Sequence, residues 1–387
     1  DAMSRKDRPP DLDTLAIHAG RSRDPEGAVV TPIYQSATFD YPAGDRELVY
    51  TRYGNNPTQL ALQERLAALE GSEAALVMAS GMGAIATAIL TVCESGDHLV
   101  AARSLYGGTH RLLDVELPRL GISVTYAGGI EPEAWEAAIR PETKLLLWEA
   151  ISNPLLRVPD TPALAALARE RGPVSLVDAT FATPINLRPI DYGVDLVMHS
   201  ATKYLGGHSD LIGGVLAGRR ERIGEATHRM HSFGASIDPH AAFLVERGVK
   251  TLAVRMARHN ENGRRVAEFL SGHERVARTH YPSLPDHPDH AVAGRILSGA
   301  GGVVTFIPDA SFEAARRLVE RLRWIRLAPS LGGVESLVSM PAQTSHRGLS
   351  REDREALGIP DATIRLALGI EAADDLVDDL DRALASL

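Results

Sequence analysis

Short apolar runs alternate with longer segments of helical periodicity over the first two thirds of the chain. The segment at 161–171, for example, repeats Leu164 and Leu167 at the spacing of one buried helix face. Strands that alternate with helices favour a mainly parallel sheet covered on both faces, and therefore an α/β fold. The runs expected to form strands lie at residues 73–78, 97–102, 122–126, 143–148, 174–177, 194–198 and 211–216.

The pattern changes near residue 241, where a long helical stretch begins and runs to about residue 270. The elements expected beyond it are strands at 302–307, 324–328 and 364–368, and helices at 312–322 and 372–387. We therefore predict a larger domain over 49–246 and a smaller C-terminal α/β domain over 247–387. Residues 1–48 lack sustained periodicity, and we predict an arm that contacts a neighbouring subunit. Thr58 is expected to cap the helix that follows this arm.

Charge and composition narrow the classes of partner. The 387 residues include 41 Lys and Arg against 50 Asp and Glu, a formal net charge of -9. This balance argues against nucleic acid or an anionic membrane surface as the main partner, because both repel an acidic protein. The single cysteine, Cys93, excludes an intramolecular disulfide, and every apolar run is too short to span a membrane. Since the start of the sequence has no signal-peptide pattern, we expect a cytoplasmic protein.

Polar and small residues directly follow five of the expected strands. Ligands bind beyond the carboxyl ends of the strands in an open parallel sheet, so we expect these residues to surround one site. Taken singly they have simpler explanations, such as a packed tyrosine or a turn acid. The residues are Ser80, Gly81 and Met82 after the first run, Tyr106 after the second, Glu149 and Asn153 after the fourth, Asp178 and Thr180 after the fifth, and Ser200 to Lys203 after the sixth.

Lys203 stands in the stretch Ser-Ala-Thr-Lys-Tyr-Leu-Gly-Gly-His that begins at Ser200. A lysine removed from water has a lowered pKa and becomes a nucleophile that forms an imine with an aldehyde. The hydroxyls of Ser200 and Thr202 beside it offer hydrogen-bond donors to a phosphate. The alternative is a solvated lysine in a turn that ends a strand.

The turn at 79–84, Ala-Ser-Gly-Met-Gly-Ala, joins a strand to a helix. Backbone N–H groups at such a helix start bind anions, so this turn is a candidate phosphate cradle. It lacks the third glycine of the dinucleotide-binding fingerprint, which argues against a nicotinamide dehydrogenase, and it lacks the Gly-Lys-Ser/Thr of a Walker loop.

Two features stand out in the C-terminal part. Arg365 lies within an apolar run and needs an anionic partner if buried, either a substrate carboxylate or a structural ion pair. A histidine-rich segment surrounds residues 281–290, but its spacing fits no common zinc pattern and no cysteine accompanies it. We therefore expect no metal and interpret the segment as a solvated loop.

Together these motifs resemble the Cys/Met-metabolism family of pyridoxal-phosphate enzymes, which includes cystathionine γ-synthase, cystathionine γ-lyase, cystathionine β-lyase and methionine γ-lyase. The resemblance implies fold type I, the aspartate-aminotransferase-like fold, with pyridoxal 5'-phosphate as cofactor and an amino acid as substrate. It also implies a homotetramer, a dimer of dimers. The motifs follow the family's order over nearly the whole chain, at residues 50–58, 80–82, 105–109, 177–181, 200–208, 330–336 and 364–365.

The resemblance further implies a role for each residue. Lys203 would bind the cofactor aldehyde covalently and then move protons, Asp178 would pair with the ring nitrogen, and Tyr106 would stack on the ring. The remaining cofactor contacts would be Gly81, Met82, Ser200 and Thr202 at the phosphate, Asn153 and Thr180 at the ring, and Tyr50 and Arg52 from a neighbouring subunit; the substrate contacts would be Ser330, Arg365 and Glu335.

The activity that this resemblance implies is γ-elimination by a carbon–sulfur lyase, which converts L-cystathionine or L-methionine to 2-oxobutyrate, ammonia and a thiol. Gly108 stands where many methionine γ-lyases carry a cysteine, and Glu335 is frequent in cystathionine-acting members, so both favour cystathionine. A γ-synthase that joins a thiol to an activated homoserine shares all these residues and remains an alternative. A non-catalytic protein that binds the cofactor is a remoter one, because a binder does not need the whole set.

Overall fold

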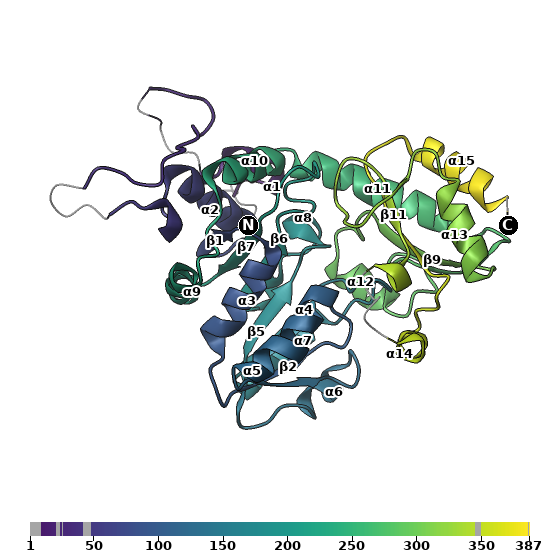
Figure 1. The fold of residues 1–387 in the computed structure, drawn as a ribbon, viewed down its shortest axis with the longest axis horizontal. Coiled ribbons are helices and arrows are strands. Elements are labelled where there is room, and N and C mark those ends of the chain that lie inside the picture. Colours follow the sequence, from purple (N-terminus) through teal and green to yellow (C-terminus); the bar gives the residue numbers. More distant parts are fainter. Residues whose placement is uncertain (1–8, 21–23, 25, 42–47, 345–349, 386) are drawn as a thin grey trace, which may run out of the picture.

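The computed structural model describes residues 9–20, 24, 26–41, 48–344, 350–385 and 387. Two sheets lie side by side, and helix α11 (Leu252–Ser271) runs across the boundary between them (Figure 1). The first sheet and its helices come from residues before α11, and the second sheet comes from residues after it.

The first sheet has seven strands in the order β1-β7-β6-β5-β4-β2-β3. Strands β6, β5, β4, β2 and β3 pair in parallel, whereas β7 is antiparallel to both β1 and β6. The prediction of an α/β fold with a mainly parallel sheet is therefore confirmed, and the apolar runs supply its strands. The bounds are β1 (Ala74–Met78), β2 (His98–Ala101), β3 (Ser123–Tyr126), β4 (Thr143–Glu149), β5 (Val174–Asp178), β6 (Leu196–Ser200) and β7 (Gly214–Gly218).

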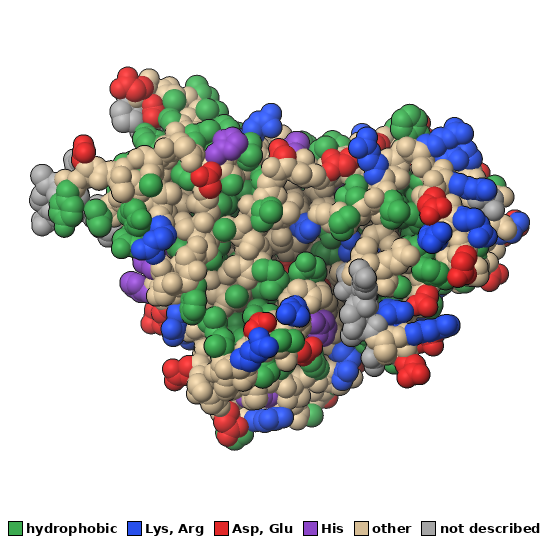
Figure 2. Space-filling view, viewed as in Figure 1, with side chains coloured by type: hydrophobic (Ala, Val, Ile, Leu, Met, Phe, Trp, Pro, Cys, Tyr) green, Lys and Arg blue, Asp and Glu red, His purple; other side chains and the backbone are tan. Residues whose placement is uncertain are grey.

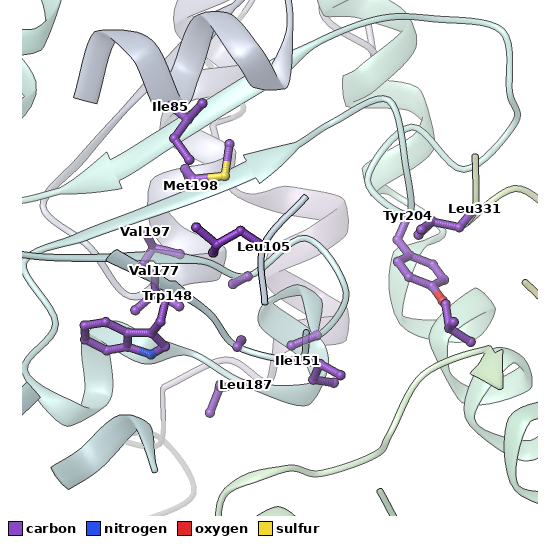
Figure 3. Close-up of a cluster of buried hydrophobic side chains, with 14 of the residues drawn as sticks. Ile85, Leu105, Trp148, Ile151, Val177, Leu187, Val197, Met198, Tyr204 and Leu331 are labelled. Atoms are coloured by element: carbon purple, nitrogen blue, oxygen red, sulfur yellow. The ribbon is translucent and has the colours of Figure 1, made fainter. Parts of the chain in front are cut away.

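Helices cover both faces of this sheet. Their bounds are α2 (Pro57–Glu70), α3 (Gly81–Val92), α4 (Gly107–Arg111), α5 (Leu117–Arg119), α6 (Pro132–Glu136), α7 (Thr161–Arg171), α8 (Thr183–Asn186), α9 (Arg220–Phe233) and α10 (Pro239–Val249). Successive side chains of β6 point to opposite faces. Met198 lies beside Ile85 of α3 (Figure 3), whereas Nε2 of His199 lies 2.6 Å from Oε1 of Glu70 in α2. Helices α2 and α3 therefore cover opposite faces.

The expected cap at Thr58 is wrong by two residues. Asn56 caps α2: its side chain accepts from the N–H of Thr58, and the Gln59 side chain accepts from the N–H of Asn56. Pro57 decides the position, because a residue without an N–H suits the first helical turn. The proline next to an asparagine was the signal in the sequence.

Part of the expected arm packs against its own chain. Residues Leu12–His18 form helix α1, and the buried Arg65 side chain donates to the carbonyl of Ala16 at 2.6 Å. Farther along, Thr31 donates to the buried carboxylate of Glu246 at 3.1 Å. Residues 1–8, 21–23, 25 and 42–47 of this arm lie outside the described residues.

The second sheet has five strands in the order β10-β11-β12-β9-β8, with only β10 and β11 parallel. Its elements are β8 (Val276–His280), β9 (Val303–Pro308), β10 (Arg326–Leu327), β11 (Leu337–Ser339), β12 (Ile364–Ala367), α12 (His290–Ile296), α13 (Phe312–Glu320), α14 (Arg351–Ala356) and α15 (Ala373–Leu384). The sequence analysis did not predict β8 and β11, which are short and lack an extended apolar run. The long helical stretch near 241–270 is two helices, α10 and α11, because the chain turns at Lys250 and Thr251.

The interpretation of residues 281–290 as a solvated loop is wrong for most of the apolar and histidine positions. Tyr281, Leu284, His287 and Asp289 are buried. The Asp289 carboxylate accepts from the Arg157 side chain at 2.7 and 3.0 Å, which joins this segment to the first half of the chain. The part of the chain that the structure describes contains no group of three or more His, Cys, Asp or Glu placed to hold a metal ion.

The surface carries its charge unevenly. Lys and Arg side chains gather over the half of the molecule that contains α13 and α15, although the net charge is -9 (Figure 2). Among the described helices, none has the length and apolar character needed to cross a membrane.

Candidate active site

A cavity of about 620 Å³ lies beyond the carboxyl ends of β1, β4, β5 and β6. It brings together eleven of the residues expected from the sequence: Gly81, Met82, Tyr106, Asn153, Asp178, Thr180, Ser200, Thr202, Lys203, Ser330 and Arg365. Apolar side chains close the rest of it, among them Ile85, Ile151, Met198 and Leu331, which Figure 3 places around the ends of the strands. The convergence of strand ends on one site is thus observed.

One end of the cavity suits an anion. The first turn of α3 begins there, and Ser80 caps the helix by accepting from the N–H of Gly83 at 3.0 Å. A Cβ on Gly81 would lie 2.8 Å from the Cβ of Ser200, so only glycine permits this close approach. The N–H groups of the helix start and the hydroxyls of Ser200 and Thr202 therefore face one space, where a phosphate would meet several donors.

Lys203 reaches the cavity from the turn after β6. Its Nζ donates to the hydroxyl of Ser330 at 2.7 Å. Burial, helped by the positive charge of Arg365, lowers the pKa of Lys203 from 10.5 to about 8. The solvated-lysine alternative does not hold, and a substantial fraction of this amine is neutral near neutral pH.

Asp178 ends β5 and faces the cavity. Its Oδ1 accepts from the N–H of Thr180 at 2.9 Å and from the Thr180 hydroxyl at 2.5 Å, and that hydroxyl accepts from the N–H of Ser200 at 2.9 Å. Burial raises the pKa of Asp178, while the two Thr180 donors and His199 act against this rise. A cationic partner in the cavity would relieve the cost of burying this carboxylate.

Arg365 enters from β12 of the second sheet. Its Nη1 donates to Oδ1 of Asn153 at 2.9 Å and its Nη2 to the carbonyl of Ser330 at 3.1 Å. Its Nε is buried without a partner, and burial lowers the pKa of Arg365 to about 10. Among the residues that the structure describes, no acid forms an ion pair with Arg365, so the structural ion pair is not observed. The arrangement suits a carboxylate ligand.

Tyr106 and Glu149 line the same cavity. The Tyr106 side chain is 50% exposed, and its N–H donates to Oε1 of Glu149 at 2.6 Å. Glu149 is the site residue to which the sequence analysis gave no role, although it was noted at a strand end. The signal was its similarity to Asp178: each is an acid at the end of a buried strand, on neighbouring strands.

Three expected site residues lie elsewhere in this chain. Arg52 donates to the carbonyl of His231 at 2.6 Å and lies over the rings of Tyr50 and Tyr53, 5.5 and 5.0 Å from their centres. Glu335 accepts from the Ser209 hydroxyl and lines a separate hollow beside Thr202 and Ser330. The structure therefore does not bring Tyr50, Arg52 or Glu335 into the cavity of their own chain.

The donors of the cavity match pyridoxal 5'-phosphate in kind and in order. The α3 start suits the phosphate, the Lys203 amine the aldehyde, Asp178 the ring nitrogen, and the Tyr106 ring a planar face. The close approach at Gly81 leaves room for the phosphate where a Cβ would intrude on Ser200. The residues present therefore fit this cofactor.

Comparisons with known proteins agree with this arrangement. The model of the family "Cys/Met metabolism PLP-dependent enzyme" matches residues 13–385. A cystathionine beta-lyase of Lactococcus lactis subsp. cremoris is 42% identical, with 96% of this chain and 98% of that protein covered. An O-succinylhomoserine sulfhydrylase of Pseudomonas aeruginosa is 40% identical, with 97% of this chain and 96% of that protein covered. The crystal structure of cystathionine gamma-lyase from Lactobacillus plantarum complexed with L-serine has a TM-score of 0.93 at 39% identity, and covers 97% of this chain and 99% of its own.

Proposed function

This chain belongs to the Cys/Met metabolism PLP-dependent enzyme family, and within it we propose that the protein is a carbon–sulfur lyase that performs γ-elimination on a sulfur amino acid. Pyridoxal 5'-phosphate dependence and the fold type I architecture come with membership of the family. The proposed substrate is L-cystathionine, with L-methionine as the second candidate. With water as co-reactant, cystathionine would yield 2-oxobutyrate, ammonia and cysteine.

The observation that carries the proposal is the position of Lys203 beside Ser330 and Arg365. Arg365 would hold the substrate carboxylate through its guanidinium, and Ser330 would add a donor. Because Lys203 already lies 2.7 Å from the Ser330 hydroxyl, a carboxylate held there brings Cα within reach of the amine. The same flexible side chain would then move protons between Cα and Cβ, which γ-elimination requires.

Each remaining residue has a proposed task at a stated group. When bound, the cofactor supplies an electron sink for negative charge at the substrate carbon. Asp178 would hold the ring nitrogen in its protonated form, and Gly81, Met82, Ser200 and Thr202 would hold the phosphate. Asn153 and Thr180 would lie at the ring, and the phenol of Tyr106, at 50% exposure, would give a proton to the departing sulfur.

Assembly and domains form part of the proposal. Tyr50 and Arg52 would complete the phosphate site of a neighbouring copy, because they lie outside the cavity of their own chain. The arm at 1–48 would contact that copy, and the proposed assembly is a homotetramer. The proposed domains are 49–246 for the cofactor and 247–387 for the C-terminal part, which supplies Ser330, Arg365 and Glu335 to the substrate.

The test is the identity of the 2-oxo acid. The protein loaded with cofactor is incubated with L-cystathionine, L-methionine or L-homocysteine, and products are separated by mass spectrometry. The proposal expects 2-oxobutyrate and cysteine from cystathionine, and no turnover by Lys203→Ala. Pyruvate and homocysteine as the main products would instead make the protein a β-lyase.

A replacement reaction is the second candidate, and the 40% identical sulfhydrylase favours including it. The same assay with O-succinylhomoserine or O-acetylhomoserine plus cysteine tests it. Cystathionine as the dominant product, formed faster than any 2-oxo acid, would replace the lyase with a γ-synthase. Release of 2-oxobutyrate despite added cysteine would support the lyase.

A further inference from the structure

Glu149 is a buried acid in the cavity to which the proposed reaction assigns no task. It ends β4, is 5% exposed, and lies opposite Asp178 in the parallel pairing of β4 with β5. Burial and the nearby Asp178 raise the pKa of Glu149, whereas two backbone donors act against the rise. A buried carboxyl beside another carboxyl is costly, so its retention needs a reason that an apolar residue would not meet.

The two oxygens of Glu149 bridge two different loops. Oε1 accepts from the N–H of Tyr106 at 2.6 Å, and Oε2 accepts from the N–H of Asn153 at 3.2 Å. These N–H groups belong to the loop after β2 and the loop after β4. A carboxyl group has two acceptor oxygens, whereas an amide of the same shape has only one. The geometry therefore calls for a carboxyl at this position.

The contacts continue beyond Asn153 around the cavity. Asn153 Oδ1 accepts from Arg365, whose other nitrogen donates to the carbonyl of Ser330. Arg365 has no ion-pair partner among the described residues, so its position depends on these two neutral acceptors. Glu149 is the only group in this chain of contacts that also holds the backbone of Tyr106.

We propose that Glu149 is a positioning residue that ties Tyr106, at the face of the cofactor ring, to the Asn153–Arg365 pair that receives the substrate carboxylate. This inference rests on the proposed roles of Tyr106 and Arg365, but not on which bond the enzyme cleaves. Loss of the bridge loosens both ends, so it weakens cofactor binding and carboxylate binding together.

The test compares Glu149→Gln with Asp379→Asn. Asp379 is a matched control: it is 3% exposed and accepts from the backbone N–H groups of Arg323 and Trp324, but it lines no part of the cavity. Cofactor dissociation constants are measured by titrating the apoproteins. Binding of L-norleucine, which has the length of methionine and no leaving group, is measured from the absorbance change of the bound cofactor.

For Glu149→Gln we expect both dissociation constants to rise about tenfold, and for Asp379→Asn neither to change, although both variants lose thermal stability. Wild-type values for both ligands in Glu149→Gln, or equal losses in the two variants, would overturn the inference. If Glu149→Gln does not fold, Glu149→Asp serves instead, because its shorter side chain reaches only one of the two N–H groups. Weaker norleucine binding by Glu149→Asp supports the inference, and wild-type binding overturns it. An enzyme that binds norleucine as expected but makes no 2-oxobutyrate would contradict only the proposed function.

Discussion

The amine of Lys203 donates a 2.7 Å hydrogen bond to the hydroxyl of Ser330, a residue 127 positions farther along the chain. Lys203 follows a strand of the first sheet, and Ser330 lies in the loop between β10 and β11 of the second. The contact therefore joins the two sheets at the cavity. It also holds the amine away from water, beside the cation Arg365, where its neutral form is favoured.

The lowered pKa of Lys203 predicts its reactivity without cofactor. In the apoprotein, labelling of Lys203 by trinitrobenzenesulfonate, followed by peptide mass spectrometry, should reach half its maximal rate near pH 8. In Arg365→Met the half-maximal pH should rise, because a neighbouring positive charge has been removed. A wild-type midpoint near the ordinary value of 10.5 would contradict the prediction.

The Thr180 hydroxyl keeps Asp178 charged, which predicts the effect of removing it. Thr180→Val should weaken cofactor binding about tenfold, because a hydrogen bond to a charged group contributes about 1.5–3 kcal/mol. Loss of this donor raises the pKa of Asp178 further, so binding should fail at a higher pH than in the wild type. Thr180→Ser keeps the hydroxyl and should bind nearly normally. Equal affinities for the Val and Ser variants, measured by cofactor titration from pH 5 to 8, would argue against this role.

Gly332 allows the Ser330 loop to approach the backbone of Lys203. It has a φ of +80°, and a Cβ there would lie 2.6 Å from the backbone nitrogen of Tyr204. Gly332→Ala should therefore displace Ser330 and raise the KM for substrate about tenfold. Gly172→Ala is the control, because Gly172 has a φ of +99° with no atom within 4 Å of an added Cβ.

Both glycine variants should lose about 1 kcal/mol of stability from the left-handed backbone, but only Gly332→Ala should change KM. Steady-state kinetics and thermal unfolding of the two variants separate the effects. The same KM in both would show that the loop tolerates the displacement.

The buried His280 predicts sensitivity to acid. Burial lowers its pKa to about 4, and Arg278 acts in the same direction. The unfolded chain therefore binds a proton below about pH 6.5, while the folded protein does not, so stability falls as the pH drops from 6.5 toward 4. At pH 5 this one residue should cost on the order of 2 kcal/mol.

His280→Leu should accordingly reduce the loss of stability between pH 7 and pH 5, measured by urea unfolding followed through tryptophan fluorescence. His290→Gln, which removes an exposed imidazole from the neighbouring helix start, is the control and should retain the wild-type difference. An unchanged pH 7 to pH 5 difference in His280→Leu would assign the acid sensitivity to other groups.

The sequence by itself determined the parallel sheet and most of the cavity. Alternating apolar runs predict strands because each run must be buried on both faces. Parallel strands then place their carboxyl ends at one edge, which is why Tyr106, Asn153, Asp178 and Lys203 were predicted to converge before any contact was known.

Only the tertiary structure decided which of these residues touch. The pairing of Glu149 with Asp178 depends on the register of β4 against β5, and the contact of Lys203 with Ser330 depends on how the second sheet packs against the first. Similarly, the absence of an acid beside Arg365 among the described residues, and the burial of His287, depend on segments far away in the chain. Local periodicity encodes which face of an element is apolar, but the partner of that face is set by packing between elements, which no single segment specifies.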